Sequence, residues 1–256
     1  IRSNDIEKKD LQKKKIGKDE FYFYKTEPKI QSTYDLLINF IPKILKNYQW
    51  KKSMKWGEFD LNWGRPLKSI LSIFDKKTIS FTFHHLVSSN STFLDKDIEE
   101  KKKIFENFKT YEKFFEKQGI IIDHNKRLKT INQSFLRILN KRKLKINENL
   151  KLIDEVVNIV DSPNILLCKF DKKFLSIPKE ILILTMETHQ KYFPIFNDKN
   201  EITNEFLIVA NKKDNKGLIK IGNERVIEAR LSDAEFFWNK DKVQNLVKKV
   251  SELKSV

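Results

Sequence analysis

The sequence predicts an α+β protein in which packed helices cover a mixed sheet. Several segments carry apolar residues at helical spacing, and several short runs are apolar or alternate in the way that is typical of strands. The two kinds of segment do not alternate regularly, which argues against a doubly wound parallel sheet. With 256 residues, 39% hydrophobic content and 20 Phe, the chain can bury a substantial core and is too apolar for a disordered protein.

The first part of the chain predicts an arm, a strand and a broken helix. Residues 1–18 are polar and rich in lysine, so we expect an arm or a frayed edge. Residues 20–27 form an alternating, aromatic segment, which predicts a strand. Apolar residues over 34–48 have helical spacing, but Pro42 lies inside this run and is expected to break the helix into two pieces.

The next part predicts loops followed by a long helix. Residues 51–75 contain two Trp-Gly pairs and an Arg-Pro pair, which indicate loops and a short strand that lead into a helix. The alternating segment 76–83 predicts another strand. Asp97 begins a capping-box pattern, so a long helix is expected from there to Gly119.

The remaining elements follow the same rules. Helical spacing predicts helices over residues 128–139 and 150–160, and the short apolar runs at 164–170 and 205–211 predict buried strands. Pro178 suits the first turn of a helix over residues 178–190.

The predicted organisation is one large domain with flanking segments. The domain spans residues 19–240 and carries a helical insertion near residues 96–161, after the polar arm of residues 1–18. Residues 241–256 would begin a further helical region. The chain starts at Ile1 rather than Met and stops inside a helix-like segment, so we expect a piece of a longer protein.

Composition favours a polyanionic partner. Lys and Arg number 51 against 35 Asp and Glu, which gives a formal net charge of +16. Such a charge attracts nucleic acid, although lysines on solvated faces are the alternative explanation. No run is long enough to cross a membrane, and no secretory leader is visible. The single Cys168 lies in an apolar run and is expected to be buried and inert, and the scattered histidines do not suggest a zinc site.

The first candidate site is the end of the helix over 178–190. A projection at 100° per residue places Thr185 and His189 on the apolar side and Glu187 on the opposite side. We therefore expect His189 to anchor the helix end inward by a hydrogen bond. General acid–base chemistry is the alternative, but it needs an orienting partner that the neighbouring sequence does not supply.

The residues after His189 are predicted to divide between surface and core. Gln190 and Lys191 should face outward, where they could meet a polyanion at the helix end together with Tyr192. Tyr192 and Phe193 should begin a strand, one ring facing the core and the other the open side.

The second candidate site is a helix that begins near Asn223. The same projection places Val226 and Phe237 on an apolar face with Arg230 in its middle. Asp233 lies at the edge of that face and Arg225 on the opposite side. A buried arginine is costly unless it is paired, so an Arg230–Asp233 pair, or a bond from Arg230 to another element, is expected. Phosphate binding by the Arg230 guanidinium is the alternative.

Five segments occur in one order across residues 50–242: KSMKWG, RPLKSI, FLSIPKEILILTMETHQKYFPIF, FLIVAN and GNERVIEARLSDAEFFWNKD. Together they closely resemble the beta subunit of bacterial heterotetrameric glycyl-tRNA synthetase, in its N-terminal portion. The sequence departs from the family after residues 79–81. It keeps Thr92, Phe93 and Leu94 but lacks the Gly-His-Arg that the family usually shows there.

The resemblance implies a part of a cytoplasmic glycine–tRNA ligase that consists of two alpha and two beta subunits. ATP and glycine would be substrates at the alpha subunit, and this chain would bind no cofactor or metal, contribute no catalytic residue and contact no membrane. It would bind and position tRNA(Gly), with a fold that resembles the editing-type region of the phenylalanyl-tRNA synthetase beta subunit. The expected tRNA-binding residues are Lys55, Arg65, Gln190, Lys191 and Arg225. The expected structural motif residues are Thr185, His189, Tyr192, Asn223, Arg230 and Asp233.

Two rival functions remain open at this point. The first is a hydrolytic editing domain that clears mischarged tRNA, with a pocket lined by His189 and Thr185. The second is a scaffold whose apolar surface docks the alpha subunit.

Overall fold

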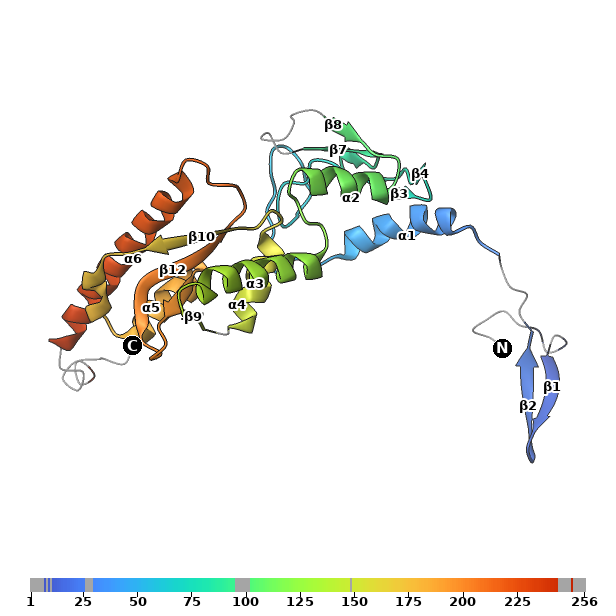
Figure 1. Ribbon diagram of the computed structural model, residues 1–256. Helices are drawn as coiled ribbons and strands as arrows, with labels where there is room; N and C mark the ends of the chain where they lie inside the picture. Colours follow the sequence, from blue (N-terminus) through green and yellow to red (C-terminus); the bar gives the residue numbers. More distant parts are fainter. Residues whose placement is uncertain are drawn as a thin grey trace. The chain divides into compact units, whose positions relative to one another are not determined.

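The computed structural model describes residues 7, 9, 11–25, 30–94, 102–147, 149–243 and 250, and it confirms the α+β class (Figure 1). The chain divides into two compact units, Ile1–Phe108 and Lys109–Val256. The boundary lies inside the predicted 19–240 domain, whose extent stays a prediction. The proposed capping box at Asp97 lies outside the described residues, as does most of 241–256.

An antiparallel hairpin comes first in the chain. Strands β1 (Leu11–Ile16) and β2 (Asp19–Tyr24) pair in register, Leu11 opposite Tyr24, around a turn in which Gly17 has a φ of +66°. The predicted aromatic strand is thus confirmed over Asp19–Tyr24. Residues 1–18 were predicted to be an arm or a frayed edge, but Leu11–Ile16 is a strand that pairs with β2.

Helix α1 (Thr33–Asn47) runs unbroken through Pro42, so the predicted break is wrong. Proline removes one backbone hydrogen bond, but most helical stability in a protein comes from packing of the apolar face. Leu37, Ile41 and Leu45 pack against the core of the first unit, which offsets that loss.

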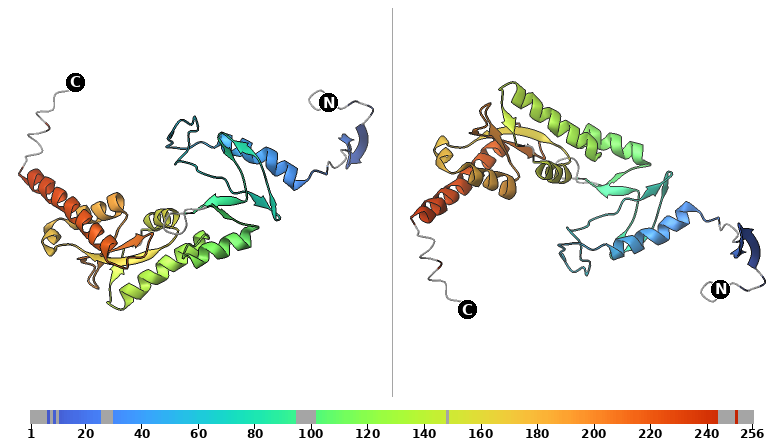
Figure 2. Two further views of the ribbon diagram at one scale, coloured as in Figure 1. Left: turned by 90° about the horizontal axis from the view of Figure 1, so that it is seen from above. Right: turned by 90° about the horizontal axis from the view of Figure 1, so that it is seen from below.

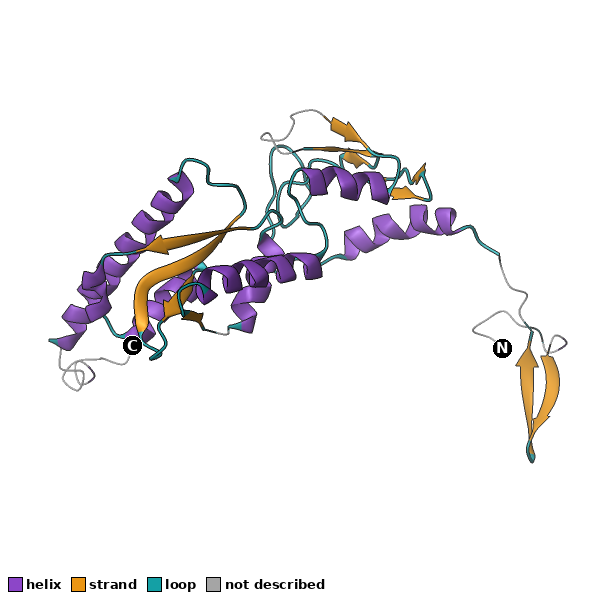
Figure 3. Cartoon of the chain, in the orientation of Figure 1, coloured by secondary structure: helices purple, strands orange, loops and turns teal. Residues whose placement is uncertain are grey.

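Short strands and loops follow α1, as Figure 3 shows. The predicted helix within 51–75 is absent from the described structure, and the predicted strand over 76–83 is split into two pieces. Between those pieces the buried Ser88 hydroxyl accepts a hydrogen bond from the Phe81 N–H at 2.8 Å and lies 2.7 Å from the Ile79 carbonyl. The short strands are β3 (Ile73–Phe74), β4 (Lys77–Thr78), β5 (Thr82–Phe83), β6 (Leu86–Val87), β7 (Ser91–Phe93) and β8 (Lys102–Ile104).

The predicted long helix before Gly119 is a strand and a shorter helix. Ile104, expected on the helical stripe, ends strand β8, and α2 (Phe108–Lys117) begins only at Phe108. The helix ends as predicted, since Gly119 has a φ of +80°. The Gly119 and Ile120 N–H groups bond back to the last turn of α2, which is the hydrogen-bond pattern of a Schellman motif.

The second unit contains a four-stranded antiparallel sheet rather than the predicted mixed one. Its strand order is β10–β12–β11–β9, and the two predicted apolar strands are adjacent, with Leu167 opposite Leu207. The strands are β9 (Lys145–Ile146), β10 (Asn164–Lys169), β11 (Phe193–Phe196) and β12 (Ile202–Ala210).

Helices cover both faces of this sheet (Figure 2). On one face, Phe206 and Ile208 pack with the segments after β10 and with α6 (Leu218–Lys242). On the other face, Leu207 packs with α3 (His124–Asn140) and α4 (Leu150–Ile159), both of which were predicted. The sheet is therefore a buried middle layer. The part of the chain that the structure describes has no helix long and apolar enough to cross a membrane.

We expect the folded chain to lose stability at alkaline pH because Cys168 is buried. Burial, and secondarily the Glu224 carboxylate, raises the pKa of the Cys168 thiol from 9.0 to about 12. The folded chain keeps this proton where the unfolded chain loses it, so rising pH favours unfolding between pH 9 and 12. Urea unfolding monitored across this window should show falling stability, and the native thiol should resist a disulfide reagent at pH 8. Rapid labelling of the folded chain at pH 8 would contradict a buried Cys168 thiol.

Candidate functional site

The helix that leads to the first candidate site changes type half-way along. Pro178 occupies the N-cap, one position before the predicted first turn, and α5 runs from Lys179 to Leu184. From Thr185 to Gln190 the backbone continues as a π-helix, η4. In a π-helix each N–H bonds to the carbonyl five residues back, so the turn is wider than in an α-helix.

The wider turn changes which residues are buried. Thr185 is buried as predicted, but Glu187 is buried and His189 is exposed, so both of these predictions are wrong. The projection at 100° per residue holds only for an α-helix and fails after Leu184. In the π-helix Glu187, five residues after Leu182, shares the buried side with it.

Glu187 ties the π-helix to the start of α4. Its two carboxylate oxygens accept hydrogen bonds from the Asn147 amide at 3.3 Å and the Asn149 amide at 2.6 Å. Asn149 is also the N-cap of α4, because its side-chain oxygen accepts the Leu152 N–H. Sequence reasoning missed this residue, and nothing next to Glu187 in the chain could have pointed to partners about 40 positions earlier.

Lys191 ends the π-helix in the left-handed conformation, with a φ of 60°. Its ammonium group lies 2.9 Å from a carboxylate oxygen of Glu155, and 34% of its side chain is exposed. Gln190 is half-buried as well. The two side chains therefore do not simply face outward, and Lys191 would exchange one carboxylate partner for another anion.

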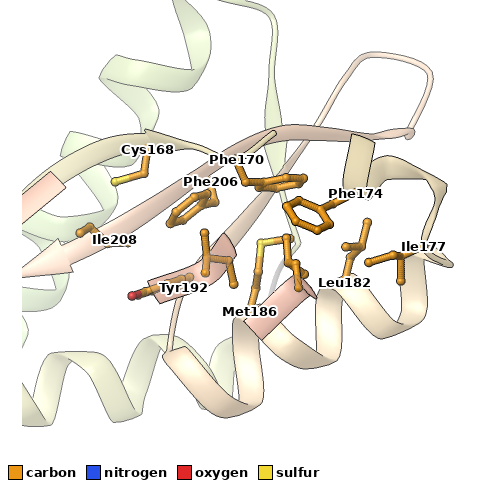
Figure 4. Packing of buried hydrophobic residues seen from close by; sticks show 11 residues of the cluster. Cys168, Phe170, Phe174, Ile177, Leu182, Met186, Tyr192, Phe206 and Ile208 are labelled. Atoms are coloured by element: carbon orange, nitrogen blue, oxygen red, sulfur yellow. The ribbon is translucent and has the colours of Figure 1, made fainter. Parts of the chain in front are cut away.

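Tyr192 and Phe193 are both buried, so the predicted open side does not exist here. The reason is that helices cover both faces of the sheet. The Tyr192 ring stacks on Phe206 with centroids 5.0 Å apart, and Figure 4 shows its hydroxyl pointing away from the apolar cluster. That hydroxyl donates to the side-chain oxygen of Asn223 at 2.6 Å. Burial, followed by the Cys168 thiol, raises the pKa of Tyr192 to about 12, so it stays a neutral donor.

These residues border a cavity of about 430 Å³ in the second unit. Its floor is apolar and comes from α4 and β12, with Val156 and Ile208 among the contributors. The cavity thus combines an apolar floor with amide, hydroxyl and ammonium groups. The polar lining residues are Gln190, Lys191, Tyr192, Asn211, Lys212 and Asn223, four of which the sequence had singled out.

Helix α6 presents its predicted arginine to solvent. Ile227 and Leu231 are buried, whereas Arg230 and Asp233 are exposed, so the prediction of a core-facing Arg230 is wrong. Val226 and Phe237 were counted as core in the projection, but both are exposed, and this turned the predicted face toward Arg230. An exposed apolar residue is common and does not mark a buried face.

The other predicted tRNA contacts are exposed. Arg225 lies on the solvent side of α6. In the first unit, Lys55 pairs with Asp60 at 3.2 Å and Arg65 donates to the Gly64 carbonyl at 2.8 Å. These two residues do not belong to the cavity of the second unit, and each keeps donor groups for other acceptors.

The family described as the glycyl-tRNA synthetase beta subunit matches this chain over residues 1–256. The chain belongs to the glycyl-tRNA synthetase beta subunit family. It is 34% identical over 255 residues to the glycine–tRNA ligase beta subunit of Rickettsia akari, which covers 99% of this chain and 38% of that protein. It is 35% identical over 256 residues to that of Rickettsia bellii strain OSU 85-389, with 100% and 39% coverage.

Membership in the beta subunit family confirms the resemblance carried by the five sequence segments. The chain spans less than two-fifths of the length of these relatives. The activity, substrates and partners of the whole protein therefore belong to the proposal that follows.

Proposed function

We propose that this chain is part of a glycine–tRNA ligase and that it binds and positions tRNA(Gly). Glycine activation with ATP takes place at an alpha subunit, and this chain holds no cofactor of its own. The observation that carries the proposal is the family match over all 256 residues. The net charge of +16 and the exposed Lys55, Arg65 and Arg225 agree with a tRNA ligand.

The geometry favours binding over hydrolytic editing. An editing pocket would have to bring Thr185 and His189 to one water molecule. Thr185 is buried, His189 is exposed, and neither is among the residues that line the cavity at Tyr192. The likeness to the phenylalanyl-tRNA synthetase editing region stays part of the proposal.

Assays on the full chain separate the three candidate functions. Alone, it should bind tRNA(Gly) and should not catalyse ATP–pyrophosphate exchange, while an added alpha subunit and the remaining beta-subunit sequence should restore glycylation. Exchange by this chain alone would contradict the proposal. Hydrolysis of mischarged tRNA that is lost in His189→Ala would favour editing, and alpha-subunit binding without any tRNA binding would favour a scaffold.

A further inference from the structure

A tight turn in the first unit brings together two aromatic rings. The Phe59 N–H donates to the Trp56 carbonyl at 3.3 Å, and Gly57 lies between them with a φ of +56°. A positive φ at this position of a turn favours glycine. The turn at Gly57 thus brings Trp56 and Phe59 close together in space.

A second turn adds a third ring. His84 and His85 connect β5 to β6, and His84 has the left-handed φ of 51° that is uncommon outside glycine. The His85 ring stacks on Phe59 with centroids 3.6 Å apart and planes within 6° of parallel. The Trp56 ring meets the same His85 edge-on at 6.0 Å.

These rings border a cavity of about 610 Å³. Phe93 and Lys68 also line the cavity. The Lys102 ammonium lies 5.0 Å from the centre of the Phe93 ring. None of the described lining residues is acidic. Between residues 50 and 94 the chain has seven Lys or Arg and three Asp or Glu, so this stretch carries a net positive charge.

Two of the lining rings, Phe59 and Phe93, are more exposed than the core rings of the same unit. Phe81 and Phe83 of the same unit are 7% and 4% exposed, whereas Phe59 is 42% exposed. Exposed rings beside lysines are the combination by which proteins hold unpaired nucleotides, because every base has a stacking face and a neighbouring phosphate. The cavity volume lies within the range usual for small-ligand sites.

We propose that this cavity, bordered by Trp56, Phe59, His85 and Phe93, binds an unpaired RNA nucleotide. The base stacks on the aromatic rings, and Lys68 and Lys102 supply charge for the adjoining phosphates. The inference rests on the proposed function, which it deepens by naming single-stranded nucleotides as the part of the RNA that this site holds.

The test compares Phe59→Leu with a matched control, Phe74→Leu, in the full chain. Phe74 is exposed to the same 42% but does not line the cavity. The probes are tRNA(Gly), an unstructured RNA of about ten nucleotides and a blunt RNA duplex of equal length, titrated by fluorescence anisotropy. Phe59→Leu should weaken binding of the unstructured RNA about tenfold, within the range for one stacked base. It should leave duplex binding and the melting temperature unchanged, and Phe74→Leu should bind all probes like the parent.

His85→Ala provides a second variant, and it should weaken binding of the unstructured RNA in the same direction. Equal binding of that RNA by Phe59→Leu, Phe74→Leu and the parent would overturn the inference and leave the proposed function intact if tRNA(Gly) still binds. A parent chain that binds none of the three probes would overturn the proposed function as well.

Discussion

Leu231→Ala should lower the free energy of unfolding by about 2–5 kcal/mol. Leu231 is fully buried on α6, where it packs in the same cluster as Phe206 and Met186 beneath one face of the sheet. Truncation removes apolar contacts and leaves a cavity that the surrounding sheet and helices fill only in part. Urea unfolding monitored by circular dichroism measures the change.

Arg230→Ala is the matched control, one residue away on the same helix. Arg230 is exposed, so its truncation should change stability by less than about 0.5 kcal/mol. An equal loss in both variants would show that α6 packs by a different face.

Tyr192→Phe should cost about 0.5–1.5 kcal/mol of stability, because it removes the hydrogen bond from the Tyr192 hydroxyl to the half-buried Asn223 side-chain oxygen. The ring still fills its place on Phe206, so the loss reports the hydrogen bond rather than packing. A second substitution, Asn223→Leu, removes the unpaired acceptor and should cost less in the Tyr192→Phe background than in the parent.

The control for this substitution is Tyr22→Phe on the N-terminal hairpin. Tyr22 is largely exposed, so losing its hydroxyl should leave the melting temperature unchanged. Additive effects of Tyr192→Phe and Asn223→Leu would contradict the hydrogen bond between them.

The elements that the sequence predicted well are those whose local pattern and surroundings agree. The helices over 128–139 and 150–160 show regular apolar spacing, and the strands over 164–170 and 205–211 are apolar on both sides because the sheet is a middle layer. In these segments the buried side follows directly from the repeat of the pattern.

The wrong predictions arose where tertiary packing decided the outcome. The residue types of Thr185–Gln190 do not distinguish a π-helix from an α-helix. No local pattern therefore showed that Glu187 would be buried in place of His189. The partners of Glu187, Asn147 and Asn149, lie about 40 residues earlier. In the first unit, the Ser88 hydroxyl interrupts what looked like one strand.

The candidate site shows the same division. The sequence singled out Gln190, Lys191, Tyr192 and Asn223, and the structure places all four around one cavity. The sequence alone could not show that Lys191 pairs with Glu155, because that contact depends on how α4 packs against the sheet.

The most direct test of tRNA binding is a titration of the full chain with tRNA(Gly) at several salt concentrations. Lysine contacts release counterions, so the logarithm of the binding constant should fall linearly with the logarithm of salt concentration, by about 0.9 per phosphate contact on a double helix. Lys191→Ala should flatten the slope by about one contact, whereas Glu155→Gln, which frees Lys191 from its ion pair, should not. Absence of binding at low salt, or a slope near zero, would contradict a tRNA-binding role for this chain.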